Sequence, residues 1–375
     1  MSKVHPADPP LARISNRIQS VDLLRGLTIA AMIMVNNPGT WSDVYAPLRH
    51  AEWHGYTPTD LIFPFFLFIV GCSIAFAYRG KQPEWPTYRK IIVRSIKLIA
   101  LGIFLGAFLI YPPFVKAWPE IRLPGVLQRI GLVFLLAAPL ALHLRSRPLA
   151  VVTVALLVGY WLIMGFVPLP DGSLPTYERA PNNWAMYLDK LLLGTHTWQE
   201  DYDPEGLLST LPAVATALIG VLTGRYLIGG TDNKTRTLIL AGAALLITGE
   251  VWSFVFPINK ALWTSSFVLV TSGWALLILG LIYYFTDVRG IEWGRVFRYA
   301  GANALILYFL SSFFAKIFGS IPVGDTSLHG YLYETIFVHD FLPGELSSLL
   351  YALVLVAFYL LLGTWLYRRG IFVKV

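Results

Sequence analysis

The sequence contains a single cysteine, Cys72, and few charged residues. Lys, Arg, Asp and Glu make up 14% of the 375 residues, against about 25% in soluble globular proteins. One cysteine cannot form an intrachain disulfide or a cysteine-based metal site. The low charge content, beside 56% hydrophobic residues, leaves too little polar surface to cover a soluble core. These shortages exclude a soluble globular protein.

What the chain has instead is hydrophobic runs of about 18 to 24 residues, long enough for a helix to cross about 30 Å of hydrocarbon. Lipid cannot satisfy free backbone groups, so such spans must be helical. We predict an all-α, polytopic transmembrane bundle of about ten spans, at 21–37, 58–78, 91–111, 125–144, 148–168, 207–224, 236–256, 263–285, 299–318 and 346–367.

The net charge is +7. The Lys and Arg residues lie mainly at the ends of these spans and form no patch typical of nucleic-acid binding. The connections on one side, together with the N-terminus and Arg236 at the edge of its span, hold 18 Lys and Arg, and those on the other side hold 6. The positive-inside rule then places both termini in the cytoplasm. We expect a cytoplasmic tail over 1–17, without a cleaved signal peptide, and a single transmembrane domain over 18–375.

Several polar residues lie within the predicted spans, where an ionisable group costs a few kcal/mol unless it is paired or hydrated. Asp22 and Arg25 can form an i,i+3 pair or contact a substrate. Arg94 and Lys97 can extend to the membrane surface or bind phosphates. Arg129 suggests an internal hydrogen bond whose partner the sequence does not identify.

A loop between the first two spans brings amides, histidines and carboxylates together on the extracytoplasmic side. It runs from Asn36 and Asn37 through His50 and His54 to Asp60. Two histidines four apart can indicate a metal, but nearby glycine and proline disfavour a helix that presents both to one ion. We predict no metal site and a general base, because histidine titrates near neutral pH.

The motifs around these residues resemble the heparan-α-glucosaminide N-acetyltransferase family, which belongs to a wider group of transmembrane acyltransferases. The similarity runs from about residue 17 almost to the C-terminus, in the order VDLLRG at 21–26, VNN at 35–37, HAEWHG at 50–55, DLIFP at 60–64, PGVLQRIG at 124–131, YDPEG at 202–206 and PINKALW at 257–263. Mammalian members have a luminal N-terminal domain and an extra preceding span, and they have asparagine at the position of His54.

This resemblance implies transfer of acetyl from cytoplasmic acetyl-CoA to the amine of a glucosamine-type sugar on the other side of the membrane. It implies that His50 is catalytic and that Asn36 assists. Substrate contacts are expected from Asn37, Trp53, His54, Asp60, Glu205 and Arg129. The form of the chain resembles a bacterial homologue in the inner membrane, with a cell-wall or scavenged amino sugar as acceptor; a homodimer is left open.

For the proposed chemistry, His50 would deprotonate the amine and the Asn36 amide would stabilise the oxyanion. Cations on the cytoplasmic half, Arg25, Arg94, Lys97 and Arg298, would hold the phosphates of acetyl-CoA. A ternary complex is preferred to an acetyl-histidine intermediate, and both remain open. The alternative functions are a secondary transporter of a small polar solute and a sugar O-acetyltransferase.

Overall fold

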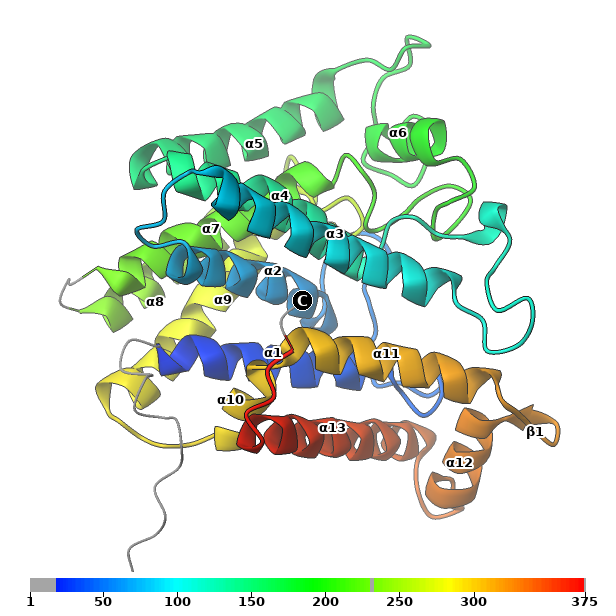
Figure 1. Cartoon of the computed structure of the whole chain (residues 1–375). Coiled ribbons are helices and arrows are strands. Elements are labelled where there is room, and N and C mark those ends of the chain that lie inside the picture. The colour runs from blue at the N-terminus through cyan, green and yellow to red at the C-terminus, as the bar shows by residue number, and fades with distance from the viewer. Residues whose placement is uncertain (1–17, 230–232, 374–375) are drawn as a thin grey trace, which may run out of the picture.

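The computed structural model describes residues 18–229 and 233–373, so the tail predicted over 1–17 lies outside the described residues. The described chain is almost entirely helical (Figure 1). Its helices are α1 Gln19–Asn36, α2 Pro58–Ala77, α3 Trp85–Ala107, α4 Val126–His143, α5 Ser146–Phe166, α6 Trp184–Leu193, α7 Thr210–Ile228, α8 Lys234–Trp252, α9 Ser265–Tyr283, α10 Arg295–Gly301, α11 Ala304–Ser320, α12 Leu328–Phe337 and α13 Gly344–Arg368.

Shorter elements lie between these helices. Two 3₁₀ turns, η2 Ala46–Leu48 and η3 Trp118–Glu120, belong to loops, and a π-helical turn, η4 Tyr284–Val288, extends α9. The strands β1 Pro322–Val323 and β2 Thr326–Ser327 pair antiparallel in a small hairpin before α12.

A helix occupies each of the ten predicted spans, namely α1 to α5, α7 to α9, α11 and α13. Seven helices are long and apolar enough to cross a membrane, and the bent pair α10–α11 raises this number to eight. The helices α1 and α3 fall outside that set because charged residues lie in their N-terminal halves. The described chain is therefore a polytopic helical membrane protein with seven or eight candidate spans, and the predicted number of ten is not confirmed.

The centre of the bundle is formed by α2, α7 and α9, and α5, α8 and α13 are more exposed. A Cβ at Gly71 of α2 would lie 1.9 Å from the carbonyl oxygen of Ala217, and one at Gly220 of α7 would lie 2.0 Å from that of Phe68. Only glycine permits this approach of two backbones, as is typical of membrane helix pairs. The exposed apolar side chains of α8, such as Leu240 and Ile247, suit contact with lipid.

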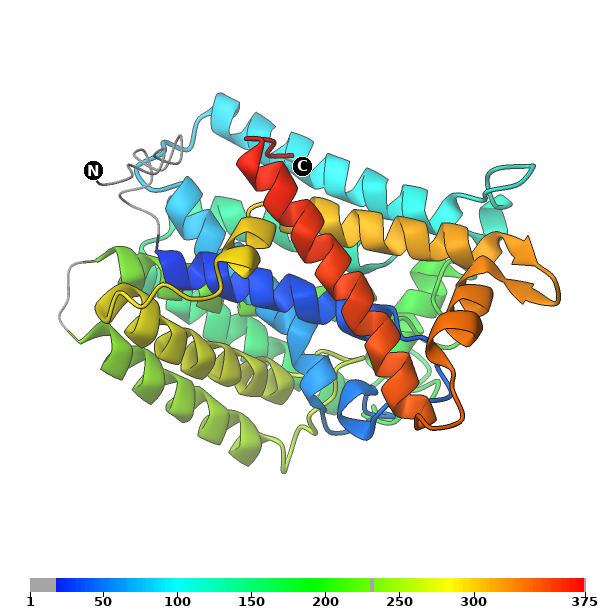
Figure 2. The same cartoon turned by 90° about the horizontal axis from the view of Figure 1, so that it is seen from below.

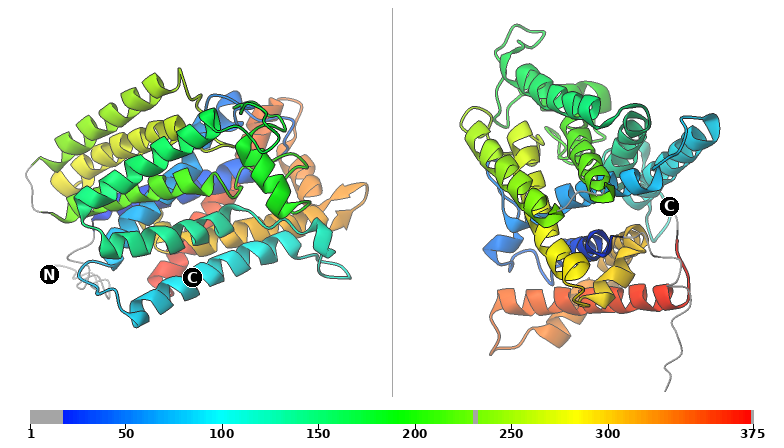
Figure 3. Two further views of the ribbon diagram at one scale, coloured as in Figure 1. Left: turned by 90° about the horizontal axis from the view of Figure 1, so that it is seen from above. Right: turned by 90° about the vertical axis from the view of Figure 1, so that its left-hand side faces the viewer.

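The long helices run between two ends of the molecule that differ in their connections (Figures 1 and 2). One end carries the turns between α2 and α3 and between α4 and α5. The other carries the long loops that include η2, α6 and α12; Figure 3 shows the same arrangement from two further sides. This polarity agrees with the predicted short basic connections on one side and long aromatic loops on the other.

Candidate active site and basic cavity

His50 lies on the loop before α2, and its ring is held by a buried carboxylate. The Nδ1 atom of His50 is 2.7 Å from Oδ1 of Asp60. The side chain of His50 is 51% exposed and that of Asp60 is 1% exposed. The carboxylate therefore fixes one ring nitrogen, while Nε2 remains on an accessible side chain.

Asp60 has its position because it is the third residue of α2. Thr57 is the residue before the helix, Pro58 begins it, and Oδ2 of Asp60 accepts hydrogen bonds from the Thr57 N–H and the Ala51 N–H, each at 3.0 Å. This is a capping arrangement. The carboxylate of Asp60 is buried and bonded to the loop it supports, and its contact with substrate stays a prediction.

Lys260 completes this group and was not among the predicted site residues. Its Nζ atom is 3.2 Å from Oδ1 of Asp60 and 2.9 Å from Nδ1 of His50. It lies on the turn between α8 and α9, more than 200 positions from His50 in sequence. The PINKALW motif contains this lysine, but neither its spacing nor its residue type identifies it as a partner of His50.

Trp53 and His54, on the same loop, contact the long loop after α5. The indole N–H of Trp53 donates to the carbonyl of Tyr177 at 3.0 Å, and its ring meets Tyr202 edge to face. Nε2 of His54 is 3.1 Å from Oε1 of Glu178. Both predicted substrate residues therefore lie close to His50 in sequence, and they contact Tyr177, Tyr202 and Glu178.

Asn36 and Asn37 end α1 and differ in exposure. Asn36 is exposed and Asn37 is buried, and each side-chain amide donates to a carbonyl one turn back, of Met32 and Ile33 respectively. Within residues 18–229 and 233–373, no hydrogen bond joins either asparagine to His50. Asn36 thus retains an exposed amide at the same end of α1 from which the His50 loop begins.

Glu205 and Arg129 are both engaged in internal contacts. Arg122 bonds Oδ1 of Asp203 at 2.6 Å and Oε2 of Glu205 at 2.5 Å. Burial alone would lower the pKa of Arg122, but the hydrogen bond to Asp203 and the charges of both carboxylates raise it. Arg129 is buried and donates to the carbonyl of Gly206 and to Ser209. Nε and Nη1 of Arg129 have no hydrogen-bond partner in the described part of the chain. The substrate contacts proposed for Glu205 and Arg129 stay predictions.

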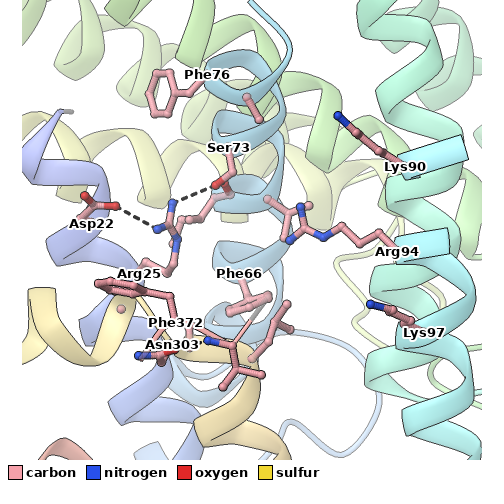
Figure 4. A pocket seen from close by; sticks show the side chains of 18 of the residues that line it. Asp22, Arg25, Phe66, Ser73, Phe76, Lys90, Arg94, Lys97, Asn303 and Phe372 are labelled. Carbon is pink, nitrogen blue, oxygen red and sulfur yellow. Dashed lines mark hydrogen bonds and ion pairs between the residues drawn. The ribbon is translucent and has the colours of Figure 1, made fainter. Parts of the chain in front are cut away.

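A basic cavity of about 1330 Å³ lies at the opposite end of α2 (Figure 4). It is bounded by the N-terminal halves of α1 and α3, the second half of α2, the α10–α11 break and the segment after α13. Its cations are Arg25, Arg89, Lys90, Arg94 and Lys97, and Asp22 is its one carboxylate within the described residues.

The predicted phosphate-binding residues Arg25, Arg94 and Lys97 all line this cavity. Arg25 donates to Asp22 at 2.9 Å and to Ser73 at 2.8 Å, so the predicted i,i+3 pair is present. Arg94 and Lys97 extend from α3 toward it (Figure 4). The buried Nε of Arg94 has no hydrogen-bond partner in the described part of the chain.

Arg298 is the exception among the predicted cations. It is absent from the cavity lining, and its guanidinium bonds the side chain of Gln19 at the start of α1. That Arg298 holds a phosphate stays a prediction. From α10, before the break, its side chain reaches the start of α1 instead.

One helix links the two sites. The cavity lining begins at Phe66 of α2, six residues after Asp60, which corresponds to about 9 Å along the helix axis. Among the described residues, no group of three or more His, Cys, Asp or Glu side chains could hold a metal ion. The arrangement thus joins an imidazole with a fixed carboxylate at one end to a cationic cavity at the other.

Comparison with known proteins assigns the family. A family model described as heparan-alpha-glucosaminide N-acetyltransferase, catalytic, matches residues 17–248. Human heparan-alpha-glucosaminide N-acetyltransferase is 31% identical over 367 residues, which cover 81% of this chain and 54% of that protein. The mouse protein is 31% identical over 356 residues, covering 78% and 53%. This chain spans about half the length of these relatives. With a match over more than half of its residues, this chain belongs to the heparan-alpha-glucosaminide N-acetyltransferase catalytic-domain family.

Proposed function

We propose that this chain is a membrane-embedded acetyltransferase. It moves an acetyl group from acetyl-CoA, bound at the basic end, to the amine of a glucosamine-type sugar that arrives at the opposite end. The observation that carries this proposal is the exposed imidazole of His50 with Nδ1 bonded to the buried carboxylate of Asp60. Family membership supports the reaction type, and the human and mouse relatives are named for this transfer.

The proposed chemistry needs a base, because an ammonium group cannot attack a thioester. The sugar ammonium first loses one proton to solvent, and the neutral amine attacks the acetyl carbon. With Nδ1 protonated and bonded to Asp60, Nε2 of His50 takes a second proton from the nitrogen as the carbon–nitrogen bond forms. The carbon–sulfur bond then breaks, and the imidazolium gives that proton to the departing thiolate. Asp60 holds the ring in the tautomer that this step requires.

Two further groups assist in this proposal. The exposed amide of Asn36 is a suitable donor for the oxyanion of the tetrahedral intermediate, and such a donor contributes about 10²–10³ in rate. Trp53 and His54 are partly accessible and are proposed to contact the sugar. Direct transfer in a ternary complex is preferred, since it requires no acetyl-imidazole exposed to water.

Acetyl-CoA is proposed to enter the basic cavity as a substrate. Arg25, Arg94 and Lys97, with Arg89 and Lys90, match the negative charge of its phosphates. Its long, thin pantetheine arm would follow α2 toward Asp60 and His50. The aromatic residues of the cavity, Phe66 and Phe76, are apolar surface for the adenine or the arm.

The proposed topology has a single transmembrane domain, both termini in the cytoplasm and ten membrane crossings. The excess of Lys and Arg at the end that carries the cavity supports this orientation. The two helices that lack the hydropathy of a span, α1 and α3, direct their charges into the cavity rather than toward lipid. We place the protein in a bacterial inner membrane.

His50→Ala tests the proposal in purified protein given acetyl-CoA and glucosamine. We expect release of free thiol to depend on glucosamine and to fall by about 10²–10⁴ in the variant. His339→Ala, which removes an exposed histidine at the same end, should remain active. Equal rates in wild-type and His50→Ala proteins would refute the proposal.

The same assay separates the alternatives. N-acetylglucosamine, whose amine is blocked, should give no thiol release, whereas an O-acetyltransferase would accept it. A transporter would take up the sugar into vesicles without consuming acetyl-CoA.

A further inference from the structure

Lys260 is the third charged group at His50, and the reaction described above does not use it. We propose that Lys260 is a positioning residue whose ammonium balances the charge of Asp60, so that His50 stays neutral and ready to accept a proton. This inference rests on the proposed function, because it assumes that His50 must act as a base. It goes further because it names Lys260, on the turn before α9, as the residue that controls the charge state of His50.

The distances define how the three groups share their bonds. Nδ1 of His50 is 2.7 Å from Asp60 Oδ1 and 2.9 Å from Lys260 Nζ. If the proton on Nδ1 is donated to Asp60, that nitrogen has no lone pair left for the ammonium. Lys260 then donates to Asp60 Oδ1 at 3.2 Å, and its ammonium also lies 3.4 Å from Nε2 of His50.

The turn that carries Lys260 is hydrogen-bonded internally and to the His50 loop. The N–H of Gly55 donates to the carbonyl of Ile258 at 2.7 Å. The side-chain oxygen of Asn259 accepts from the N–H of Leu262 at 2.9 Å, and the backbone N–H of Asn259 donates to the Thr264 hydroxyl at 3.0 Å. The Lys260 side chain is only 20% exposed. Its ammonium is therefore held at this position, unlike that of a mobile surface lysine.

The charges near His50 explain why this cation matters. A buried carboxylate alone stabilises the imidazolium, which cannot act as a base. A cation beside both groups opposes that effect. Asp60 can then orient the ring without stabilising its protonated form. The other titratable groups of this region are engaged elsewhere or exposed: Arg49 donates to Val44, His54 pairs with Glu178, Tyr56 bonds Glu250, and Glu52 is exposed.

A chemical probe tests the inference without requiring acetyl transfer. Diethyl pyrocarbonate modifies neutral imidazole, and mass spectrometry of the His50 peptide measures its rate of modification as a function of pH. In Lys260→Met, we expect the pH dependence of that rate to move about one unit higher, because imidazolium becomes more favourable. Lys260→Arg, which keeps the charge, should retain the wild-type profile.

Lys190→Met is the matched control, because it removes an exposed lysine of α6 at the same end. An unchanged modification profile in folded Lys260→Met protein would overturn the inference. So would an equal shift in Lys260→Arg or Lys190→Met.

Activity supplies a second readout. The acidic limb of kcat/KM should move to higher pH in Lys260→Met, and activity should recover as the pH rises, whereas a structural defect would lower activity equally at every pH. If wild-type protein shows no acetyl transfer, the proposed function fails. The probe experiment would still report whether Lys260 governs the charge of His50.

Discussion

Asp60 illustrates what can and cannot be predicted for a single residue. It lies ten residues from His50, so the sequence places both on the loop and first turn before a span. The sequence does not predict that Asp60 turns inward to cap α2 and bond His50, because a carboxylate at this position is equally compatible with substrate contact. Lys260 could not be predicted as a partner at all, since its approach depends on how the turn before α9 folds over the loop.

The cations of α3 give a test at the same scale. Arg94→Gln with Lys97→Gln should weaken acetyl-CoA binding at least about tenfold, since each charge-assisted bond is worth about 1.5–3 kcal/mol. Isothermal titration calorimetry in detergent measures the dissociation constant. Arg145→Gln with Arg147→Gln makes the same charge change at the same end but outside the cavity, and should leave it unaltered. Equal affinity of all three proteins would leave Arg94 and Lys97 as interfacial anchors only.

At the scale of the element, hydrophobic runs predicted where helices lie but not where they break. The span predicted at 299–318 is two helices, α10 and α11, bent by 83°. The break is stabilised by contacts that spacing does not reveal. The side chain of Asn303 bonds the carbonyl of Ile371 and the N–H of Val373, each at 3.0 Å. This break and the segment after α13 together line the basic cavity.

The close packing of α2 against α7 leads to a prediction about stability. Gly220→Ala would place a Cβ 2.0 Å from the carbonyl oxygen of Phe68, and the nearest atoms are all backbone atoms of α2, which cannot move aside as a side chain can. We expect a loss of about 1–3 kcal/mol, measured as a lower thermal midpoint in detergent. Gly159→Ala in α5, where no atom lies within 4 Å of the added carbon, is the control and should not destabilise. A Gly220→Ala protein as stable as its parent would show that α2 and α7 can separate.

For the whole molecule, composition and the lengths of the hydrophobic runs predicted a polytopic helical bundle. Spans of this length must be helical in lipid. The positions of the ten segments were also predicted, since each has the length of a span. The number of crossings was harder to predict. The charges of α1 and α3 make both helices less apolar than a span, and only the folded chain reveals that these charges line a cavity.

The proposed transfer between the two ends of the molecule is the central claim, and vesicles test it most directly. Purified protein is reconstituted with glucosamine trapped inside, and acetyl-CoA carrying a labelled acetyl group is added outside. Vesicles whose cavity end faces outward should accumulate labelled N-acetylglucosamine in the lumen, and His50→Ala vesicles should not. Labelled product formed only on the side of acetyl-CoA, or formed equally by His50→Ala, would contradict the account.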